Sequence, residues 1–201
     1  MKVEEKRSSA IIKAVIMAVL LAIVIVSVYF ILVVRGEKKQ SDEDNLVLSD
    51  VQEITTLDLD RTYPQTEKDV LDLYGRIMKV LHAGGYTDEE FNTIESKLEG
   101  IYDDELLANQ TDCYQAIKDE VTQKQEDGYT ISNFVVCDDE AIIHKVEDGR
   151  DCASARVLYS VKHSGKTMTT YYIYVLRKDD EGRWKILGWS ISDGSLTGDS
   201  E

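Results

Sequence analysis

One uncharged, almost wholly apolar run, residues 14–34, constrains the architecture of this chain more than any other feature. Its sequence is AVIMAVLLAIVIVSVYFILVV, in which Ser27 is the only strongly polar residue. A helix of that length rises about 31 Å, close to the hydrocarbon thickness of a bilayer. A buried helix of a soluble protein would normally carry a polar face along such a length. We therefore predict a transmembrane helix at 14–34.

A cleaved signal peptide is the main alternative to a permanent anchor. Its apolar region usually spans about 7 to 15 residues and ends at a cleavage site with small side chains. Here the run is longer, and Tyr29, Phe30 and Arg35 lie at its exit. The sequence therefore favours an uncleaved signal anchor.

The charges that flank the run indicate its orientation. Four basic residues precede it within 1–13 and three follow it within 35–39, and basic residues are enriched on the cytoplasmic side of membranes. No second apolar run brings the chain back. We expect a single-pass protein of the cell membrane, with a cytoplasmic tail at 1–13 and an extracytoplasmic C-terminal domain.

The rest of the chain is strongly acidic. Residues 1–40 hold seven of the 23 basic and three of the 38 acidic residues, which leaves 16 basic residues, 35 acidic residues and a net charge of −19. Such a charge repels phosphate backbones and anionic lipid headgroups. We therefore expect no nucleic acid partner. The predicted contact with the lipid bilayer is made by residues 14–34. A body of this size can bury a core of its own.

Helical signals dominate the first half of the acidic part. Residues 35–62 are polar at first and are expected to form an extracytoplasmic tether that docks near its end. Capping boxes that begin at Thr66 and Thr87 precede apolar residues at helical spacing, which predicts two helices. A third helix is expected over about 104–125, with a break near Thr111.

After Gly128 the apolar period changes from about 3.6 to 2, and β-branched and aromatic residues dominate, which predicts strands. Helices followed by strands define the α+β class. The predicted domain covers 63–193, and 194–201 are expected to form a flexible acidic tail. The predicted strands are 129–137, 140–146, 152–163, 167–178 and 183–192.

The pairing of the long strands decides which side chains share a face of the sheet. We expect His163 to stand opposite Thr167, and a slip of one residue would exchange the two faces. One face then holds the core, with Ala153, Ala155, Val157, Tyr159 and Val161 beside Thr169, Tyr171, Ile173 and Val175. The opposite face carries the predicted ligand or partner surface, made of Tyr172, Tyr174, Leu187 and Trp189.

Three helices followed by an antiparallel meander that closes on GRWKILGW, Gly182 to Trp189, resemble the nuclear transport factor 2-like superfamily over about residues 64–193. The chain is also similar to a group of uncharacterised single-span, membrane-anchored proteins of Gram-positive bacteria. The features that carry this similarity are one tail, one span, a tether, a YPQT helix start and the ending RKDDEGRWKILGW. The superfamily resemblance implies helices packed on a curved antiparallel sheet that forms a cone. It also implies that the cone can hold a ligand and that the open sheet face can pair two subunits.

Catalytic signals are weak in this sequence. Enzymes of the resembled superfamily, such as ketosteroid isomerases and polyketide cyclases, place an acid or base inside the cone. We expect His82 to be a dipole partner or an exposed residue at the end of the first helix. His144 and His163 form no spacing motif with a serine, cysteine or carboxylate. No catalytic residue is therefore predicted; the alternative is a cone-pocket enzyme of isomerase, cyclase or hydratase type.

Metal and cofactor signals are also weak. A calcium-loop pattern that begins at Asp58 has Tyr63 where the sharp turn requires glycine. The other acidic clusters are expected to be solvated turns and helix starts, so we predict no metal and no cofactor. The three cysteines are expected to be buried thiols: Cys113, Cys137 and Cys152.

These features favour a binding or assembly role. We expect a non-catalytic, membrane-tethered module that recognises a protein partner or a small apolar ligand, as a homodimer or with an envelope protein partner. A scaffold for a larger envelope machine is a nearby version, since scaffold proteins of conjugative secretion systems also join one span to a domain of this fold.

Removal of residues 1–40 should leave a soluble, folded protein, whereas the full chain should sediment with membranes. The apolar run accounts for membrane association, and the predicted core lies entirely after it. Ultracentrifugation of cell lysates and circular dichroism of the shortened protein measure the two properties. Aggregation of the shortened protein would instead mean that the span packs against the domain.

Overall fold

The computed structural model describes residues 49–192. The described residues belong to one of the two units into which the chain divides, Leu48–Glu201. The predicted span at 14–34, with the tail before it and most of the tether after it, lies outside the described residues, as does 194–201. None of the helices within the described part is long and apolar enough to cross a membrane.

Five α-helices precede the sheet in the described residues, where three were predicted. Thr66 and Thr87 cap their helices by accepting a hydrogen bond from the backbone N–H three residues on, as the capping boxes predict. The third predicted helix is interrupted, because a second cap at Asp112 starts a new helix. The helices are α2 Asp50–Thr55, α3 Glu67–Ala83, α4 Asp88–Ile101, α5 Asp104–Ala108 and α6 Cys113–Glu126.

Helix α2 was not predicted from the sequence. Ser49 and Gln52 form a capping box at its start, and Ile54 is only 1% exposed. Arg76 of α3 donates a hydrogen bond of 2.7 Å to the carboxylate of Glu53. The folded domain therefore begins before residue 63, within the segment predicted to be a tether.

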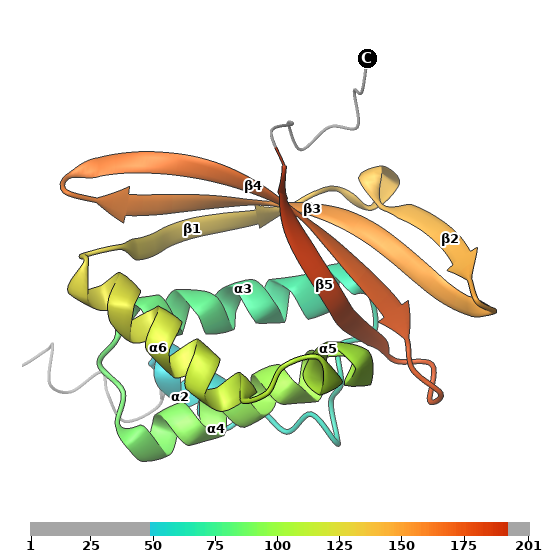
Figure 1. Cartoon of the computed structure of the whole chain (residues 1–201), viewed down its shortest axis with the longest axis horizontal. Coiled ribbons are helices and arrows are strands. Elements are labelled where there is room, and N and C mark those ends of the chain that lie inside the picture. Colours follow the sequence, from blue (N-terminus) through green and yellow to red (C-terminus); the bar gives the residue numbers. More distant parts are fainter. Residues whose placement is uncertain (1–48, 193–201) are drawn as a thin grey trace, which may run out of the picture. The chain divides into compact units, whose positions relative to one another are not determined.

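Five antiparallel strands form one open, twisted sheet (Figure 1). Its order is β1-β3-β4-β5, and β2 pairs with the same edge of β3 as β1 does. A 3-10 helix at Asp139–Ala141 replaces the start of the predicted strand 140–146. The strands are β1 Thr130–Val136, β2 Ile143–Glu147, β3 Arg150–His163, β4 Lys166–Lys178 and β5 Trp184–Ser192. The α+β class and the antiparallel sheet are thus as predicted.

A two-residue turn joins β3 to β4. Ser164 and Gly165 have φ angles of 49° and 75°, and tight hairpin turns between twisted strands need positive φ at both central residues. His163 therefore pairs with Lys166, whereas the sequence analysis placed Thr167 opposite it. The predicted register is wrong by one residue, because the turn is shorter than expected.

This shift exchanges the two faces of β4. Val157 pairs with Tyr172 and Ala155 with Tyr174, so both tyrosines lie on the core face and not on the opposite one. Trp189 of β5 pairs with Tyr174 and joins them. The β4 residues predicted for the core lie instead on the opposite face: Thr169, Tyr171, Ile173 and Val175.

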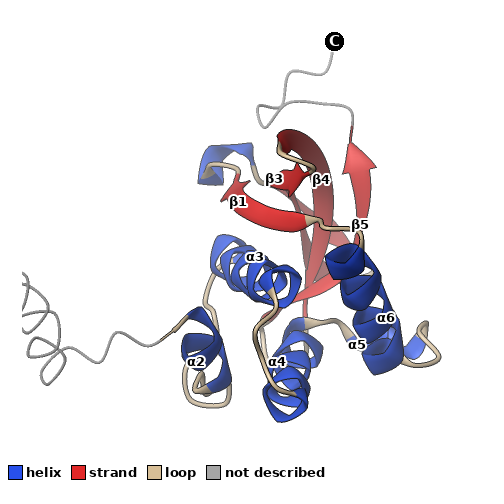
Figure 2. Ribbon diagram, turned by 90° about the vertical axis from the view of Figure 1, so that its left-hand side faces the viewer, coloured by secondary structure: helices blue, strands red, loops and turns tan. Residues whose placement is uncertain are grey.

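The five α-helices lie on one face of the sheet (Figure 2). Helix α3 contacts β1, β3 and β5, and α4 lies beside α3. Each fully buried leucine or isoleucine between the layers stabilises the fold by about 1.5–3 kcal/mol. The largest of these side chains include Leu71, Ile77, Leu81, Ile94, Leu98, Leu176 and Ile186.

Helix α3 approaches β1 closely at Gly75. A Cβ atom added there would lie 2.5 Å from Cδ2 and Cε2 of the Phe134 ring. The absence of a side chain thus allows the ring to lie against the helix backbone. Phe134 in turn contacts Tyr159 of β3, with ring centroids 6.2 Å apart.

Replacement of Gly75 by alanine should lower the free energy of unfolding by roughly 1–3 kcal/mol, because overpacking outweighs the gain in helix propensity. Urea unfolding followed by circular dichroism measures this change. Gly100→Ala is the matched control, since its added Cβ would meet only Cδ1 of Leu59, at 3.0 Å. If Gly75→Ala were as stable as the wild-type protein, the close approach of helix and ring would be contradicted.

Candidate functional site

A cavity of about 390 Å³ lies between α3, α6 and the core face of the sheet. Aromatic and aliphatic side chains form most of its wall, and its charged or titratable groups include His82, Glu120 and Lys124. We call it the aromatic cavity. Enclosed, mainly apolar hollows with a few polar groups are the usual form of small-molecule sites.

Helical spacing supplies one wall of the aromatic cavity. Tyr74, Met78 and His82 follow one another at intervals of four residues on α3, so their side chains lie on one face of the helix. The capping box at Thr66 and the contact of Gly75 with the sheet fix the position of this helix.

The sheet supplies the opposite wall. Tyr159, Tyr172 and Tyr174 line the cavity from β3 and β4, and Trp189 lines it from β5. They face the helices because of the register that the Ser164 turn imposes.

Helix α6 closes the cavity and is tied to the other helices near both ends. Near its start, the Tyr114 hydroxyl donates to Asn92 Oδ1 of α4 over 2.8 Å. At its end, Gln125 Nε2 donates to the backbone carbonyl of Leu81 over 2.6 Å. These ties hold the middle of the helix in place, where Glu120 and Lys124 border the cavity.

Tyr74 is the centre of an aromatic cluster in the wall. Its ring centroid lies 5.3 Å from that of Tyr174, 6.0 Å from Trp189 and 6.2 Å from Tyr102. The hydroxyls of Tyr159 and Tyr174 are 3.2 Å apart and share a hydrogen bond. Burial raises the pKa of Tyr74 and of Tyr174 well above the ordinary value, so both rings stay neutral phenols at physiological pH.

A second cavity of about 440 Å³ adjoins the first along α6. The two share Tyr74, Met78, Glu120 and Trp189 as lining residues. The indole of Trp189 is 40% exposed, so it stands at the boundary of both hollows. The site thus has two adjoining parts with a common aromatic wall.

The charged groups of the aromatic cavity differ in their surroundings. His82 is 7% exposed; its Nδ1 lies 2.9 Å from the Met78 carbonyl, and burial lowers its pKa, so the ring is neutral at pH 7. Lys124 places its Nζ 5.1 Å from the centroid of Tyr129. The carboxylate of Glu120 forms no ion pair or hydrogen bond with another of the described residues.

The cavity contains three of the four residues predicted for the ligand or partner face. Tyr172, Tyr174 and Trp189 line it, but from the core face and not from an open one. Leu187 falls at the register shift in β5 and does not line it. His82 lies in the last turn of α3, as predicted, with its ring bonded to the Met78 carbonyl, but it is buried in the wall, which corrects the alternative of an exposed residue.

Sequence reasoning missed the helical half of the cavity. Tyr74 and Met78 fit the helical spacing of core residues, and their spacing with His82 was the only available signal of a shared wall. Glu120 lies on the predicted third helix, and only the tertiary structure brings it to the sheet.

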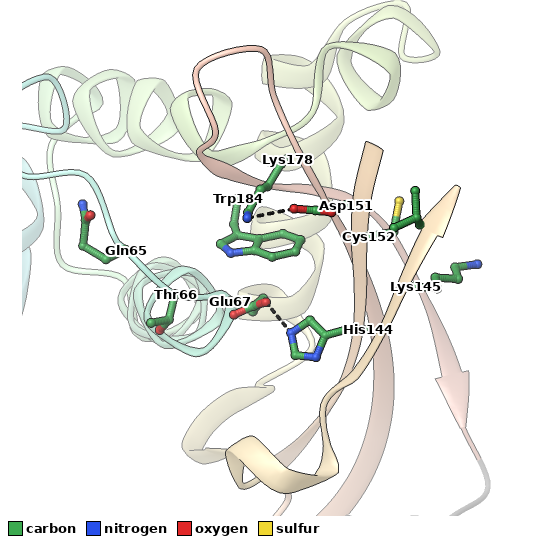
Figure 3. A pocket seen from close by; sticks show the side chains of 10 residues that line it. Gln65, Thr66, Glu67, His144, Lys145, Asp151, Cys152, Lys178 and Trp184 are labelled. Carbon is green, nitrogen blue, oxygen red and sulfur yellow. Dashed lines mark hydrogen bonds and ion pairs between the residues drawn. The ribbon is translucent and has the colours of Figure 1, made fainter. Parts of the chain in front are cut away.

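A separate groove of about 510 Å³ lies at the start of α3 (Figure 3). Glu67 Oε1 is 2.7 Å from His144 Nε2, across 77 positions in the chain. Lys178 Nζ is 3.0 Å from Asp151 Oδ2, and the indole of Trp184 lies between the two pairs (Figure 3). A charged ligand would have to compete with the contact between Glu67 and His144 and with the ion pair of Lys178 and Asp151, so the aromatic cavity is the stronger candidate.

The cysteines and one acidic turn behave as predicted. Cys113, Cys137 and Cys152 are free thiols and are buried. Asp58 accepts hydrogen bonds from the backbone N–H groups of the two residues that form its turn, Asp60 and Arg61. Within residues 49–192, no three histidine, cysteine, aspartate or glutamate side chains are grouped so that they could hold a metal ion.

The fold and the site together define a small α+β domain with an aromatic cavity between its helices and an antiparallel sheet. The sequence family described as Domain of unknown function (DUF6715) matches residues 1–189, and the chain belongs to this family. No curated protein matches the chain.

One of the buried carboxyl groups outside the aromatic cavity lies on α4. Glu95 is 6% exposed, and its Oε1 atom has no hydrogen-bond partner. Burial, and next the negative charge of Glu99, raise the pKa of Glu95 to about 7. Burial and the same two carboxyl groups raise the pKa of the nearby Cys113 thiol to about 11. Ionised Glu95 is therefore unfavourable in the folded protein.

Glu95→Gln should raise the free energy of unfolding at pH 8 by about 1 kcal/mol or more, because it removes a buried charge. A carboxyl group whose pKa is higher in the folded state stabilises the fold below its unfolded pKa of about 4.3 and loses this contribution as pH rises. The wild-type protein should therefore lose stability, relative to the variant, between that pH and the folded pKa of about 7.

Urea unfolding at a series of pH values measures this difference. Glu89→Gln, an exposed position of the same helix, is the control and should change stability by no more than about 0.5 kcal/mol. The same pH dependence in Glu95→Gln and the wild-type protein would show that Glu95 does not titrate abnormally.

Proposed function

We propose that the protein is a membrane-anchored, extracytoplasmic binding module that takes a small, largely apolar ligand into the aromatic cavity and does not change it chemically. The cavity of about 390 Å³, with tyrosines from α3 and the sheet on opposite walls, carries this proposal. Such a hollow removes apolar ligand surface from water, which is the main source of affinity at sites of this kind.

The arrangement of the layers supports a nuclear transport factor 2-like fold. Helices lie on one face of a twisted antiparallel sheet (Figures 1 and 2), and the aromatic cavity lies between the two layers. A cone of this kind with an internal hollow is what the resemblance through GRWKILGW implies.

The apolar run supports the membrane anchor. Residues 14–34 carry no charge over a length that matches a bilayer core. The family match extends from residue 1 to residue 189 and so includes both this run and the folded domain. A tethered binding module would keep its ligand near the outer surface of the membrane.

A protein partner would fit the face of the sheet opposite the α-helices. By the strand pairing, Leu158, Tyr171 and Ile173 share this face, and Val135 beside Leu158 is 42% exposed. Neighbouring apolar side chains on an open sheet face are suited to a second copy of the chain or to an envelope protein. This surface and the cavity can be used at the same time, because they lie on opposite sides of the sheet.

A cone-pocket enzyme of isomerase, cyclase or hydratase type is the second candidate. His82 favours it, because this neutral imidazole lines the aromatic cavity and could accept a proton. However, the hydrogen bond of Nδ1 is to the Met78 carbonyl, and no carboxylate among the described residues is bonded to the ring. A binding role needs no such partner.

The neutral fluorophore N-phenyl-1-naphthylamine should bind the protein that lacks residues 1–40, with increased emission on direct excitation of the probe. Thr170→Trp should weaken this binding at least about tenfold, because Thr170 lines the cavity and an indole would fill much of its volume.

Thr167→Trp is the matched control for the probe experiment. It lies three residues away on the same strand, is exposed and does not line the cavity, so it should bind the probe as the wild-type protein does. Unchanged binding by folded Thr170→Trp would show that the probe binds elsewhere, and the proposed function would fail.

A further inference from the structure

We infer that the ligand of the aromatic cavity carries an organic cation, a quaternary or alkyl-substituted ammonium group, which lies against the indole of Trp189 where the two adjoining cavities meet. This inference rests on the proposed binding function and names the chemistry of the ligand. The ring faces, the position of Glu120 and the balance of charge around the cavity carry it.

Of the three rings, the indole of Trp189 is the one that a ligand can reach, because Trp189 is 40% exposed whereas Tyr74 and Tyr174 are 4% and 2% exposed. The centroid of Tyr74 lies 5.3 Å from that of Tyr174 and 6.0 Å from that of Trp189, and the last two are also 6.0 Å apart. Their planes are tilted by 64°, 42° and 35°, so neither tyrosine stacks flat on the indole. An ammonium group within about 6 Å of a ring centroid is attracted to the ring, and tryptophan attracts it most strongly.

One cation–π contact is already made at the wall of the aromatic cavity, by Lys124. Its Nζ lies 5.1 Å from the centroid of the Tyr129 ring, and both residues line the aromatic cavity. The protein therefore already places one ammonium group over a ring at one side of the hollow. The remaining rings, around Tyr74 and Trp189, have no such cation from the described residues.

Glu120 supplies the opposite charge. It borders both adjoining cavities, and its carboxylate forms no ion pair or hydrogen bond with any residue in the described part of the chain. Burial is the largest cause of the raised pKa of Tyr172, and the negative charge of Glu120 is the second. The field of Glu120 therefore reaches the cavity. A carboxylate beside aromatic faces attracts an organic cation that also has apolar surface to bury.

The negative charge is uncompensated in the adjoining cavity, whereas Lys124 balances Glu120 in the aromatic cavity. His82 is neutral at pH 7, because burial lowers its pKa. Among residues 49–192, no lysine or arginine lines the adjoining cavity, to which Asp112 adds a second carboxylate. The chain as a whole carries a net charge of −15, which favours the approach of cations.

Choline and its uncharged carbon isostere, 3,3-dimethylbutan-1-ol, test the inference as a matched pair. Both should be titrated by calorimetry into the full chain in nanodiscs of phosphatidylglycerol, a lipid without a quaternary ammonium group, with empty nanodiscs as the blank. Choline should bind at least about fivefold more tightly, because only its charge interacts with the ring faces and with Glu120.

Two variants separate charge from shape. Glu120→Gln should weaken choline binding about two- to fivefold and leave the alcohol unchanged, since the position is exposed and partly screened. Trp189→Leu should weaken choline binding about five- to tenfold while it keeps an apolar wall. Glu126→Gln, on the same helix but outside both cavities, is the control and should bind choline as the wild-type chain does.

The outcomes distinguish this inference from the proposed function. If choline binds no more tightly than the alcohol, or if Glu120→Gln and Trp189→Leu have no effect, the cation inference is overturned. If N-phenyl-1-naphthylamine still binds in a way that Thr170→Trp blocks, the cavity remains a binding site for uncharged ligands. If that probe also fails, the proposed function falls with it.

Discussion

The tight turn at Ser164 and Gly165 determines which side chains the helices meet. Both residues have positive φ, so β3 reverses into β4 with two residues and His163 pairs with Lys166. Because side chains alternate across a strand, this pairing places Tyr172 and Tyr174 on the same face as Val157 and Ala155. A turn longer by one residue would send the tyrosines to the other side of the sheet, and the aromatic cavity would lose the wall that they form.

The cavity also depends on how α6 is held. Hydrogen bonds from Tyr114 and Gln125 tie the helix to α4 and to the end of α3, so its position does not require its middle to pack tightly on the sheet. The fold thereby combines a well-filled core between α3, α4 and the sheet with a hollow beside it. Close packing fixes the core, whereas hydrogen bonds near the two ends of α6 preserve the hollow.

Local signals in the sequence predict most of the elements. The capping boxes at Thr66 and Thr87 lie within one helical turn of the backbone groups that they satisfy, and the change of period after Gly128 marks the strands. The register failed because it depends on the exact length of one turn. The helical wall of the site was missed because Glu120 and Trp189 line the same cavity only through packing between segments far apart in the chain. The pairing of Glu67 with His144 was likewise invisible in the sequence, since 77 positions separate them.

The positions of the two indoles allow the intrinsic tryptophan fluorescence of the protein to report on both hollows. The chain contains two tryptophans, and each stands in a different hollow: Trp184 in the groove at the start of α3 and Trp189 between the two adjoining cavities. Trp184 is 7% exposed and Trp189 is 40% exposed, so water quenches and red-shifts the two emissions to different extents. Occupancy of either hollow therefore alters a distinct part of the intrinsic spectrum, and no attached dye is needed to tell the two places apart.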